Sequence, residues 1–137
     1  MSMIAPGSTI GILGGGQLGR MLASAANQLG FDVHIFCPED DAPASRAARQ
    51  TWIADYSDDA ALRAFAKSCD VVTLEFENIP ASTAKAIADC GVALHPGPKA
   101  LAISQDRAEE KAFLNSIDIP TAPYEIISAA ADIPGAL

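Results

Sequence analysis

Residues 9–22 read Thr-Ile-Gly-Ile-Leu-Gly-Gly-Gly-Gln-Leu-Gly-Arg-Met-Leu, an apolar run that leads through a glycine cluster into an amphipathic segment. This order predicts a β-strand, a tight turn and a helix. Gly14, Gly16 and Gly19 have the G-x-G-x-x-G spacing, which permits a sharp turn, close approach of a ligand and packing of the helix on the sheet. The free N–H groups at the helix start favour an anionic or polar ligand. The spacing alone does not identify that ligand, and a tight turn without a ligand is the alternative interpretation.

Strand-like and helix-like segments alternate along the chain, which is typical of an α/β domain with a mainly parallel sheet. Together with the glycine turn, this alternation predicts a three-layer Rossmann-like domain. The expected strands cover residues 9–13, 32–36, 51–54, 71–75 and 92–94. The expected helices cover residues 17–29, 43–50, 59–68, 82–89 and 101–115, with Asp58 or Asp59 as the cap of the third.

The pattern changes beyond the fifth expected strand. The charged helix over residues 101–115 is followed by a stiff, proline-containing connector at 119–123 and by a segment at 124–127 that favours a strand. An alanine-rich stretch, 128–137, ends the chain. We therefore expect one compact domain followed by the opening of a second.

The composition is that of an ordinary globular protein. The chain has 137 residues, half of them hydrophobic, and a formal net charge of −8 at pH 7, which suits one domain with its own core. The negative charge argues against nucleic-acid binding, because no basic stripe is present to displace counterions. No apolar run approaches the roughly 20 residues that span a bilayer, and residues 1–7 lack the basic start of a signal peptide. We expect a cytoplasmic protein with no membrane or nucleic-acid partner.

The cysteine and histidine residues do not form a metal-ligand pattern. Cys37, Cys69 and Cys90 are widely spaced in apolar segments, so we expect buried free thiols in a reducing compartment. His34 and His95 have no Cys, His or acidic partner at metal-ligand spacing. We therefore expect structural histidines and no metal site.

An acidic run follows the second expected strand. A nicotinamide dinucleotide site needs an acidic residue there to hold the ribose hydroxyls, and Glu39 has that place. However, Glu39, Asp40 and Asp41 are consecutive carboxylates, which sit poorly beside a pyrophosphate. A solvated turn is the alternative interpretation of this run.

A second acidic cluster, Glu75-Phe76-Glu77-Asn78-Ile79-Pro80, begins at the carboxyl end of the fourth expected strand. Ligands of open α/β sheets bind at that edge, and residues two apart on a strand face the same side. Glu75 and Glu77 therefore form a candidate pair that takes ribose hydroxyls or an amine, or shares a proton. The alternative is that one or both cap the following helix.

A run of mixed charge, Ser104–Lys111, lies on the expected helix beyond residue 100. Such a run is usually a solvated helix face stabilised by ion pairs. Neither this run nor the rest of the chain contains an arguable Ser-His-Asp or Cys-His arrangement.

Several motifs in order match one family. The sequence closely resembles the N-terminal part of the 5-(carboxyamino)imidazole ribonucleotide synthases, which are ATP-grasp enzymes of purine biosynthesis. The resemblance covers essentially the whole chain. The segments that carry it are Gly11–Met21, Asp55-Tyr56, Glu75–Pro80, Pro96–Lys99, Gln105–Arg107 and Ile119–Pro123.

The resemblance implies a ligase reaction in which ATP activates bicarbonate and the carboxyl group passes to the amine of 5-aminoimidazole ribonucleotide. It implies a pre-ATP-grasp substrate domain over 1–103 and, over 104–137, a connector helix and the start of an ATP-grasp domain. ATP and Mg²⁺ would then be bound mainly outside this chain, and the full-length enzyme would be a homodimer. The resemblance thus implies no catalytic residue within this chain, and a chain without the phosphoryl-transfer machinery is expected to be inactive alone.

The resemblance also implies roles for particular residues. The implied ribonucleotide contacts are Gly16, Gln17, Leu18, Glu75 and Glu77. Arg107 would reach the ATP phosphates, a task that suits an always-charged guanidinium, although composition alone indicates a solvated face there. Two other classes stay open: an NAD(P)-binding oxidoreductase or redox-sensing module, and a non-catalytic domain whose exposed apolar surface forms a subunit interface.

Overall fold

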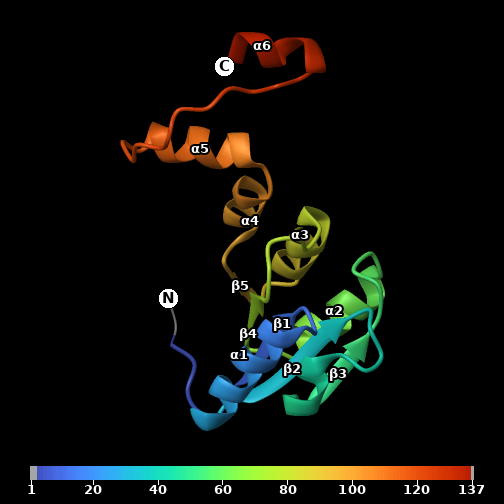
Figure 1. The fold of residues 1–137 in the computed structure, drawn as a ribbon. Helices are drawn as coiled ribbons and strands as arrows, with labels where there is room; N and C mark the ends of the chain where they lie inside the picture. The colour runs from blue at the N-terminus through green and yellow to red at the C-terminus, as the bar shows by residue number, and fades with distance from the viewer. Residues whose placement is uncertain (1–2, 137) are drawn as a thin grey trace. The chain divides into compact units, whose positions relative to one another are not determined.

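The computed structural model describes residues 3–136. The chain divides into two compact units, Met1–Ala102 and Ile103–Leu137. Figure 1 shows the first unit as a sheet with flanking helices and the second as helical segments joined by extended chain.

A five-stranded, all-parallel sheet forms the first unit, with strand order β3-β2-β1-β4-β5. The strands are β1 (Thr9–Leu13), β2 (Asp32–Cys37), β3 (Gln50–Ile53), β4 (Val71–Leu74) and β5 (Ala93–His95). The central strand β1 pairs with β2 on one side and with β4 on the other (Figure 1). The strand order reverses between β1 and β4, and in open α/β sheets ligands bind at the carboxyl ends of the strands at such a switch point. The predicted α/β class with a mainly parallel sheet is confirmed.

Helices cover both faces of this sheet. In the first unit they are α1 (Gln17–Gln28), η1 (Pro43–Ala47), α2 (Asp59–Lys67), α3 (Ala81–Asp89) and the start of α4 (Pro98–Gln105). Successive residues of a strand point to opposite faces, and β1 and β2 divide their side chains accordingly. Ile12 and Ile35 are buried in one cluster with α1 and η1, whereas Phe36 is buried with α2 and α3 in the other. Two apolar clusters therefore enclose the sheet in three layers.

The boundaries of α1 and α2 follow from residues near their ends. Gly30 has a φ of +83° directly after the α1 cap, a conformation that glycine adopts without steric cost. Asp58 caps α2, where its side chain accepts a 3.0 Å hydrogen bond from the Ala61 N–H. The predicted cap of this helix is therefore Asp58 rather than Asp59.

Three predicted elements are wrong. The helix expected over 43–50 is only the short 3₁₀ turn η1, and β3 already begins at Gln50. The helix expected over 101–115 is two helices, α4 and α5 (Arg107–Ser116), because the Asp106 side chain accepts hydrogen bonds from two N–H groups of the next turn and starts a new helix there. The strand expected over 124–127 does not form among the described residues, because no neighbouring strand pairs with it there.

The second unit contains α5, the 3₁₀ turn η2 (Ala130–Asp132) and the short helix α6 (Ile133–Ala136). The connector that follows α5 is attached to it through Lys111. Its ammonium donates to the Ala122 carbonyl at 3.2 Å and lies 4.7 Å from the centre of the Tyr124 ring. A hydrogen bond and a cation–π contact therefore hold this extended segment on α5.

Candidate functional site

A cavity of about 350 Å³ lies at the carboxyl ends of the strands in the first unit. Its lining follows four neighbouring strands: Gly15 and Gly16 come after β1, Glu39 after β2, Tyr56 after β3, and Glu75 after β4. The remaining lining residues are Asp41, Ala42, Pro43 and Phe76. The cavity therefore lies at the edge of the sheet where the topology predicts a ligand.

The glycine turn and Glu75 are joined by hydrogen bonds. The Gly14 N–H donates to the Phe36 carbonyl at 2.9 Å, and the Glu75 N–H donates to the Leu13 carbonyl at 2.9 Å. These two hydrogen bonds continue the β1–β2 and β1–β4 ladders beyond the ends of the strands. The Gly16 N–H donates to Glu75 Oε2 at 2.7 Å. The carboxylate of Glu75 therefore lies at the amino end of α1, where the helix dipole and the free N–H groups stabilise an anion.

This contact explains the glycines in the turn. Gly14 has a φ of +115°, and a Cβ atom placed there would lie 2.5 Å from Glu75 Oε2. A Cβ atom on Gly15 would lie 2.6 Å from Cys37 Sγ, behind the turn. Gly19 is close to the Gly14 carbonyl, 2.8 Å from the position of its would-be Cβ atom. Side chains at these positions would displace the Glu75 carboxylate or the packing beneath it.

The residues predicted to bind substrate are not all in the cavity. Gly16 and Glu75 meet there, but Gln17 lies in a neighbouring hollow along α1, and Leu18 is 56% exposed outside the cavity lining. Glu77 is also outside that lining. The predicted alternation from Glu75 to Glu77 is wrong, because β4 ends at Leu74 and the chain then turns.

Arg107, the predicted contact of the ATP phosphates, is the first residue of α5 in the second unit. Its guanidinium is exposed and pairs with the Glu110 carboxylate one turn later. This pair is the i,i+3 contact expected on a solvated helix face. The side chain is reached by solvent and so is accessible to an anion.

Tyr56 and Phe76 are site residues that the sequence analysis did not single out. The Tyr56 ring packs 5.9 Å from the Phe36 ring, and its carbonyl accepts a 2.8 Å hydrogen bond from the buried Thr83 hydroxyl of α3. Thr83 therefore fixes the backbone that presents Tyr56. The signal for Tyr56 was its place directly after a strand, within the Asp55-Tyr56 pattern.

The cavity is rich in hydrogen-bond acceptors. Three carboxylates line it, those of Glu39, Asp41 and Glu75, and the described lining contains no basic side chain. Asp41 is paired with the exposed Arg46 at 3.1 Å. Burial raises the pKa of the Tyr56 hydroxyl, and the nearby Cys37, Glu39 and Glu75 raise it further. Tyr56 therefore stays protonated at neutral pH and acts as a hydrogen-bond donor.

None of the cysteine and histidine residues is in the described cavity lining. Cys37 is a buried free thiol beneath the glycine turn, and Cys69 and Cys90 are partly buried free thiols. Burial lowers the pKa of His34, whose Nδ1 lies 2.9 Å from the Ser68 hydroxyl. Within residues 3–136, no group of three or more His, Cys, Asp or Glu side chains has the arrangement of a metal site. No helix in that range is long and apolar enough to cross a membrane.

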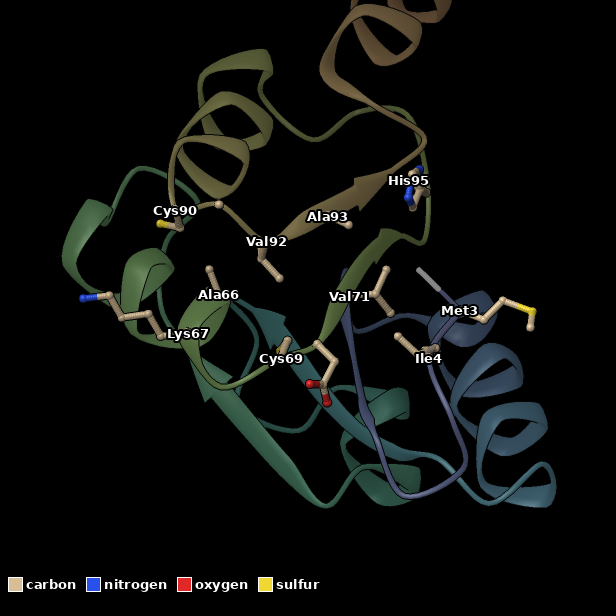
Figure 2. Close-up of a pocket in the computed structure, with 12 residues that line it drawn as sticks. Met3, Ile4, Ala66, Lys67, Cys69, Val71, Cys90, Val92, Ala93 and His95 are labelled. Carbon is tan, nitrogen blue, oxygen red and sulfur yellow. The ribbon is translucent and has the colours of Figure 1, made fainter. Parts of the chain in front are cut away.

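A larger hollow of about 1080 Å³ lies beside β5, away from the glycine turn. Figure 2 shows Val71 of β4 and Ala93 of β5 beside Met3 and Ile4 of the N-terminal segment, with Lys67 directed outward at the far side. The lining is mostly apolar and includes neither the glycine turn nor Glu75. The smaller cavity is therefore the candidate site.

Comparison with known proteins identifies relatives of this domain. The chain is 49% identical to the bifunctional purine synthesis protein purC/E of Dictyostelium discoideum over 135 residues, which are 98% of this chain and 13% of that protein. It is 49% identical to the N5-carboxyaminoimidazole ribonucleotide synthase of Brucella melitensis over 124 residues, 90% of this chain and 34% of that enzyme. The chain thus spans about a third or less of the length of these relatives.

Solved structures agree with the sequence relatives. The N5-carboxyaminoimidazole synthetase of Staphylococcus aureus in complex with ADP matches with a TM-score of 0.88 and 36% identity, over 96% of this chain and 35% of that one. The Aspergillus clavatus synthase in complex with ADP and 5-aminoimidazole ribonucleotide matches with a TM-score of 0.75 and 33% identity, over 86% of this chain and 31% of that one.

The family model of the ribonucleotide synthetase preATP-grasp domain matches residues 7–105, which include every strand of the sheet and the complete cavity lining. Three findings agree with one another. The sheet is parallel and reverses its strand order between β1 and β4, the glycine turn is hydrogen-bonded to Glu75, and the family model matches most of the chain. The chain belongs to the ribonucleotide synthetase preATP-grasp domain family.

Proposed function

We propose that this chain is the ribonucleotide-binding part of an N5-carboxyaminoimidazole ribonucleotide synthase. The full-length protein would be an ATP-dependent carbon–nitrogen ligase of purine biosynthesis. It would carboxylate the amine of 5-aminoimidazole ribonucleotide with bicarbonate. The observation that carries the proposal is the 2.7 Å hydrogen bond from the Gly16 N–H to the Glu75 carboxylate. The place that a dinucleotide diphosphate takes in other glycine turns is filled here by a side chain.

The chemistry of the cavity supports a sugar rather than a diphosphate. Glu39 and Glu75 would repel a diphosphate, and the described lining offers no basic side chain to compensate. Hydroxyl groups, in contrast, donate hydrogen bonds to carboxylates. Phe76 adds an apolar wall. The relative from Aspergillus clavatus, which is solved with the ribonucleotide, supports the same ligand class.

The residue roles are part of this proposal. Glu75 would accept hydrogen bonds from the ligand on the side that faces away from Gly16. Gln17 and Leu18, in the exposed first turn of α1, would contact the part of the ribonucleotide that extends beyond the cavity, and Glu77 would border it from the turn after β4. Arg107 would contact ATP phosphates. Each role can be tested separately by substitution.

ATP, Mg²⁺ and bicarbonate would be bound mainly by parts of the synthase outside this chain. The described residues provide no cluster of metal ligands for Mg²⁺, so no step of the reaction is assigned to a metal held here. We propose that residues 1–103 are the substrate domain, that 104–137 begin the nucleotide-binding domain, and that the chain alone has no synthase activity. We propose a homodimer as the full-length form from the family resemblance, and a cytoplasmic location from the free cysteines, which suit a reducing compartment.

The test is a titration of the isotope-labelled chain with 5-aminoimidazole ribonucleotide, followed by the amide resonances of Gly15, Gly16 and Glu75. We expect these amides to shift saturably while that of Gly91, which lines the separate hollow beside β5, does not. NADH is the competing ligand. Saturable shifts with NADH and none with the ribonucleotide would overturn the proposal in favour of a dinucleotide-binding module. A separate assay with ATP, bicarbonate and the ribonucleotide should release no phosphate from the chain alone.

A further inference from the structure

The helix α1 is apolar on two of its sides. The side that faces the sheet carries small buried residues, Gly19, Ala23 and Ala26. The second apolar side, which we call the α1 stripe, follows the helical spacing of three or four residues and consists of Leu18, Leu22, Ala25 and the cap residue Leu29. This stripe is exposed, and solvent reaches 68% of Leu29. A helix that is apolar on more than one side is typical of the interior of a larger protein.

The α1 stripe faces the half of the sheet that contains β4 and β5. The Asn27 side-chain amide donates to the Ala47 carbonyl of η1 at 2.7 Å. Therefore η1, which connects β2 to β3, lies on one flank of α1. Because successive helix residues are rotated by about 100°, the stripe points to the opposite flank. The strands against which α1 packs are β1 and β2, so the stripe borders the open side of β4 and β5.

That side of β4 and β5 carries no helix of its own in the described part of the first unit. Val72 and Leu94 are buried in the cluster that contains α2 and α3. Neighbouring residues of a strand point to opposite faces, so Val71, Ala93 and His95 point to the α1 face, where Val71 is half-buried and the other two are exposed. These three residues line the hollow of about 1080 Å³ beside β5 (Figure 2). The α1 stripe and this hollow together form what we call the apolar corner.

The shape of the apolar corner indicates what kind of partner it fits. An interface around a two-fold axis joins a surface patch to the same patch of a second copy, so the patch must be complementary to itself. A hollow beside a helix flank is concave and needs a convex partner instead. The relatives contain additional chain that can provide one, because the match covers only 34% of the Brucella melitensis synthase and 35% of the Staphylococcus aureus structure.

We propose that the apolar corner is a docking surface for a later part of the same synthase polypeptide, from which an apolar segment fills the hollow beside β5 and covers the α1 stripe. This inference rests on the proposed function, because it needs a full-length synthase. It concerns a different surface, since the cavity lining contains no residue of the apolar corner. Burial of the corner removes apolar side chains from water, which favours the docked state.

The experiment compares two proteins by hydroxyl-radical footprinting, which measures the solvent exposure of single side chains. One is the 137-residue chain. The other is a chimera in which this chain is followed by the part of the Brucella melitensis synthase beyond its matched region. We expect Leu22 and Leu29 to be oxidised about fivefold more slowly in the chimera, because close packing excludes water. The matched internal control is Ile53 of β3, at the opposite edge of the sheet, which is 52% exposed and should react equally in both proteins.

A pair of substitutions tests whether the corner itself makes the contact. Leu29→Glu places a charge on a side chain that is exposed in the chain alone, so the urea midpoint of the chain should not change. In the chimera the charge would be buried, and Leu22 should then be oxidised as fast as in the chain alone. Ile53→Glu is the matched control and should keep the protection of Leu22. Circular dichroism verifies folding, and the Brucella part added as a separate polypeptide gives the same comparison if the chimera does not fold.

Each contrary result has a distinct meaning. Equal oxidation of Leu22 and Leu29 in the two folded proteins would overturn the docking surface. Protection already present in the chain alone would also overturn it. In that case sedimentation would separate cover by a second copy, which Leu29→Glu would dissociate, from cover by the second unit. The ribonucleotide titration of the chain alone tests the proposed function independently, so failure of docking with intact ribonucleotide binding leaves that function standing.

Discussion

The Glu75 carboxylate accepts a 2.7 Å hydrogen bond from the Gly16 N–H, a contact that joins residues 59 positions apart in the sequence. It joins the residue that follows β4 to the beginning of α1, at the carboxyl ends of the adjacent strands β1 and β4. The N-cap residue of α1 is Gly16, which has no side chain, and Glu75 accepts from the backbone N–H of this N-cap residue, as the glutamate of a capping box does. Stability of the domain and shape of the cavity therefore depend on the same contact.

Replacing Glu75 by glutamine tests the charge in this contact. Glu75→Gln keeps an acceptor but removes the anion from the amino end of α1, so we expect the free energy of unfolding to fall by about 1 kcal/mol. Urea denaturation measures the change. Glu125→Gln is the matched control, because Glu125 is an exposed glutamate of the second unit, and it should stay within about 0.5 kcal/mol of the parent chain. Equal effects of the two substitutions would show that the charge at the helix start does not stabilise the turn.

A pair of glycine substitutions separates backbone strain from contact with Glu75. Gly14 and Gly7 both have positive φ, +115° and +93°, but a Cβ atom at Gly14 would lie 2.5 Å from Glu75 Oε2 and one at Gly7 would have nothing within 4 Å. We expect Gly7→Ala to cost about 1 kcal/mol. Gly14→Ala should cost about 2 kcal/mol more, because it adds overpacking to the strain. If urea denaturation gives the two variants the same stability, the close approach of Glu75 to the turn is wrong.

His34 makes stability depend on pH in a defined direction. Burial lowers its pKa below 6.5, the nearby Arg49 lowers it further, and Asp32 partly opposes both. The unfolded chain therefore takes up a proton near pH 6.5 while the folded chain remains neutral there, so the contribution of His34 is present above pH 6.5 and is lost as the pH falls below it.

The measurement compares unfolding free energies at about pH 7.5 and about pH 5.5. The loss over this range should be smaller in His34→Gln than in the parent chain. His95→Gln removes the other histidine, which is exposed, and should keep the parental loss. If His34→Gln loses as much unfolding free energy between the two pH values as the parent chain does, the pH dependence of stability comes from other groups.

The break between α4 and α5 is tested at Asp106. The Asp106 carboxylate accepts from the Ala108 N–H at 2.8 Å and from the Glu109 N–H at 3.1 Å. Asp106→Ala should expose both amides and destabilise the start of α5 by about 1 kcal/mol, whereas Asp106→Asn retains an acceptor and should cost less. Hydrogen exchange at the two amides is the measurement. Unchanged protection in Asp106→Ala would mean that the carboxylate does not start the helix.

Local patterns were sufficient to predict most of the first unit. The apolar run of β1, the glycine turn and the helical spacing of α1 are adjacent in sequence, and their physical requirements are short-range. Gly30 and Asp58 mark helix boundaries through their own backbone or side-chain preferences. The parallel sheet follows from strands that alternate with helices.

Predictions that depended on distant or competing contacts were less accurate. The contact of Gly16 with Glu75 is set by the pairing of β1 with β4, which no local pattern encodes. Asp106 stands within a charged run that favours one continuous helix, and only its capping hydrogen bonds divide that run. Residues 124–127 have the composition of a strand, but a strand also needs a neighbouring edge to pair with.

The place of Tyr56 in the cavity also depends on a contact between residues that are distant in the sequence. Its role depends on Thr83, 27 positions further along the chain, whose hydroxyl holds the Tyr56 carbonyl. The sequence placed Tyr56 after a strand but gave no sign that α3 would fix it there. Which side chains converge on a cavity is decided by packing between elements, and that information is distributed over the whole domain.

In glycine-rich loops that bind phosphates, the negative group that the loop encloses comes from the ligand. Here the negative group is encoded in the polypeptide, since Glu75 is contributed by the strand beside the loop. The loop can therefore reach its final conformation as soon as β4 has joined the sheet, before any small molecule arrives. The conformation of this loop is thereby set by the chain itself.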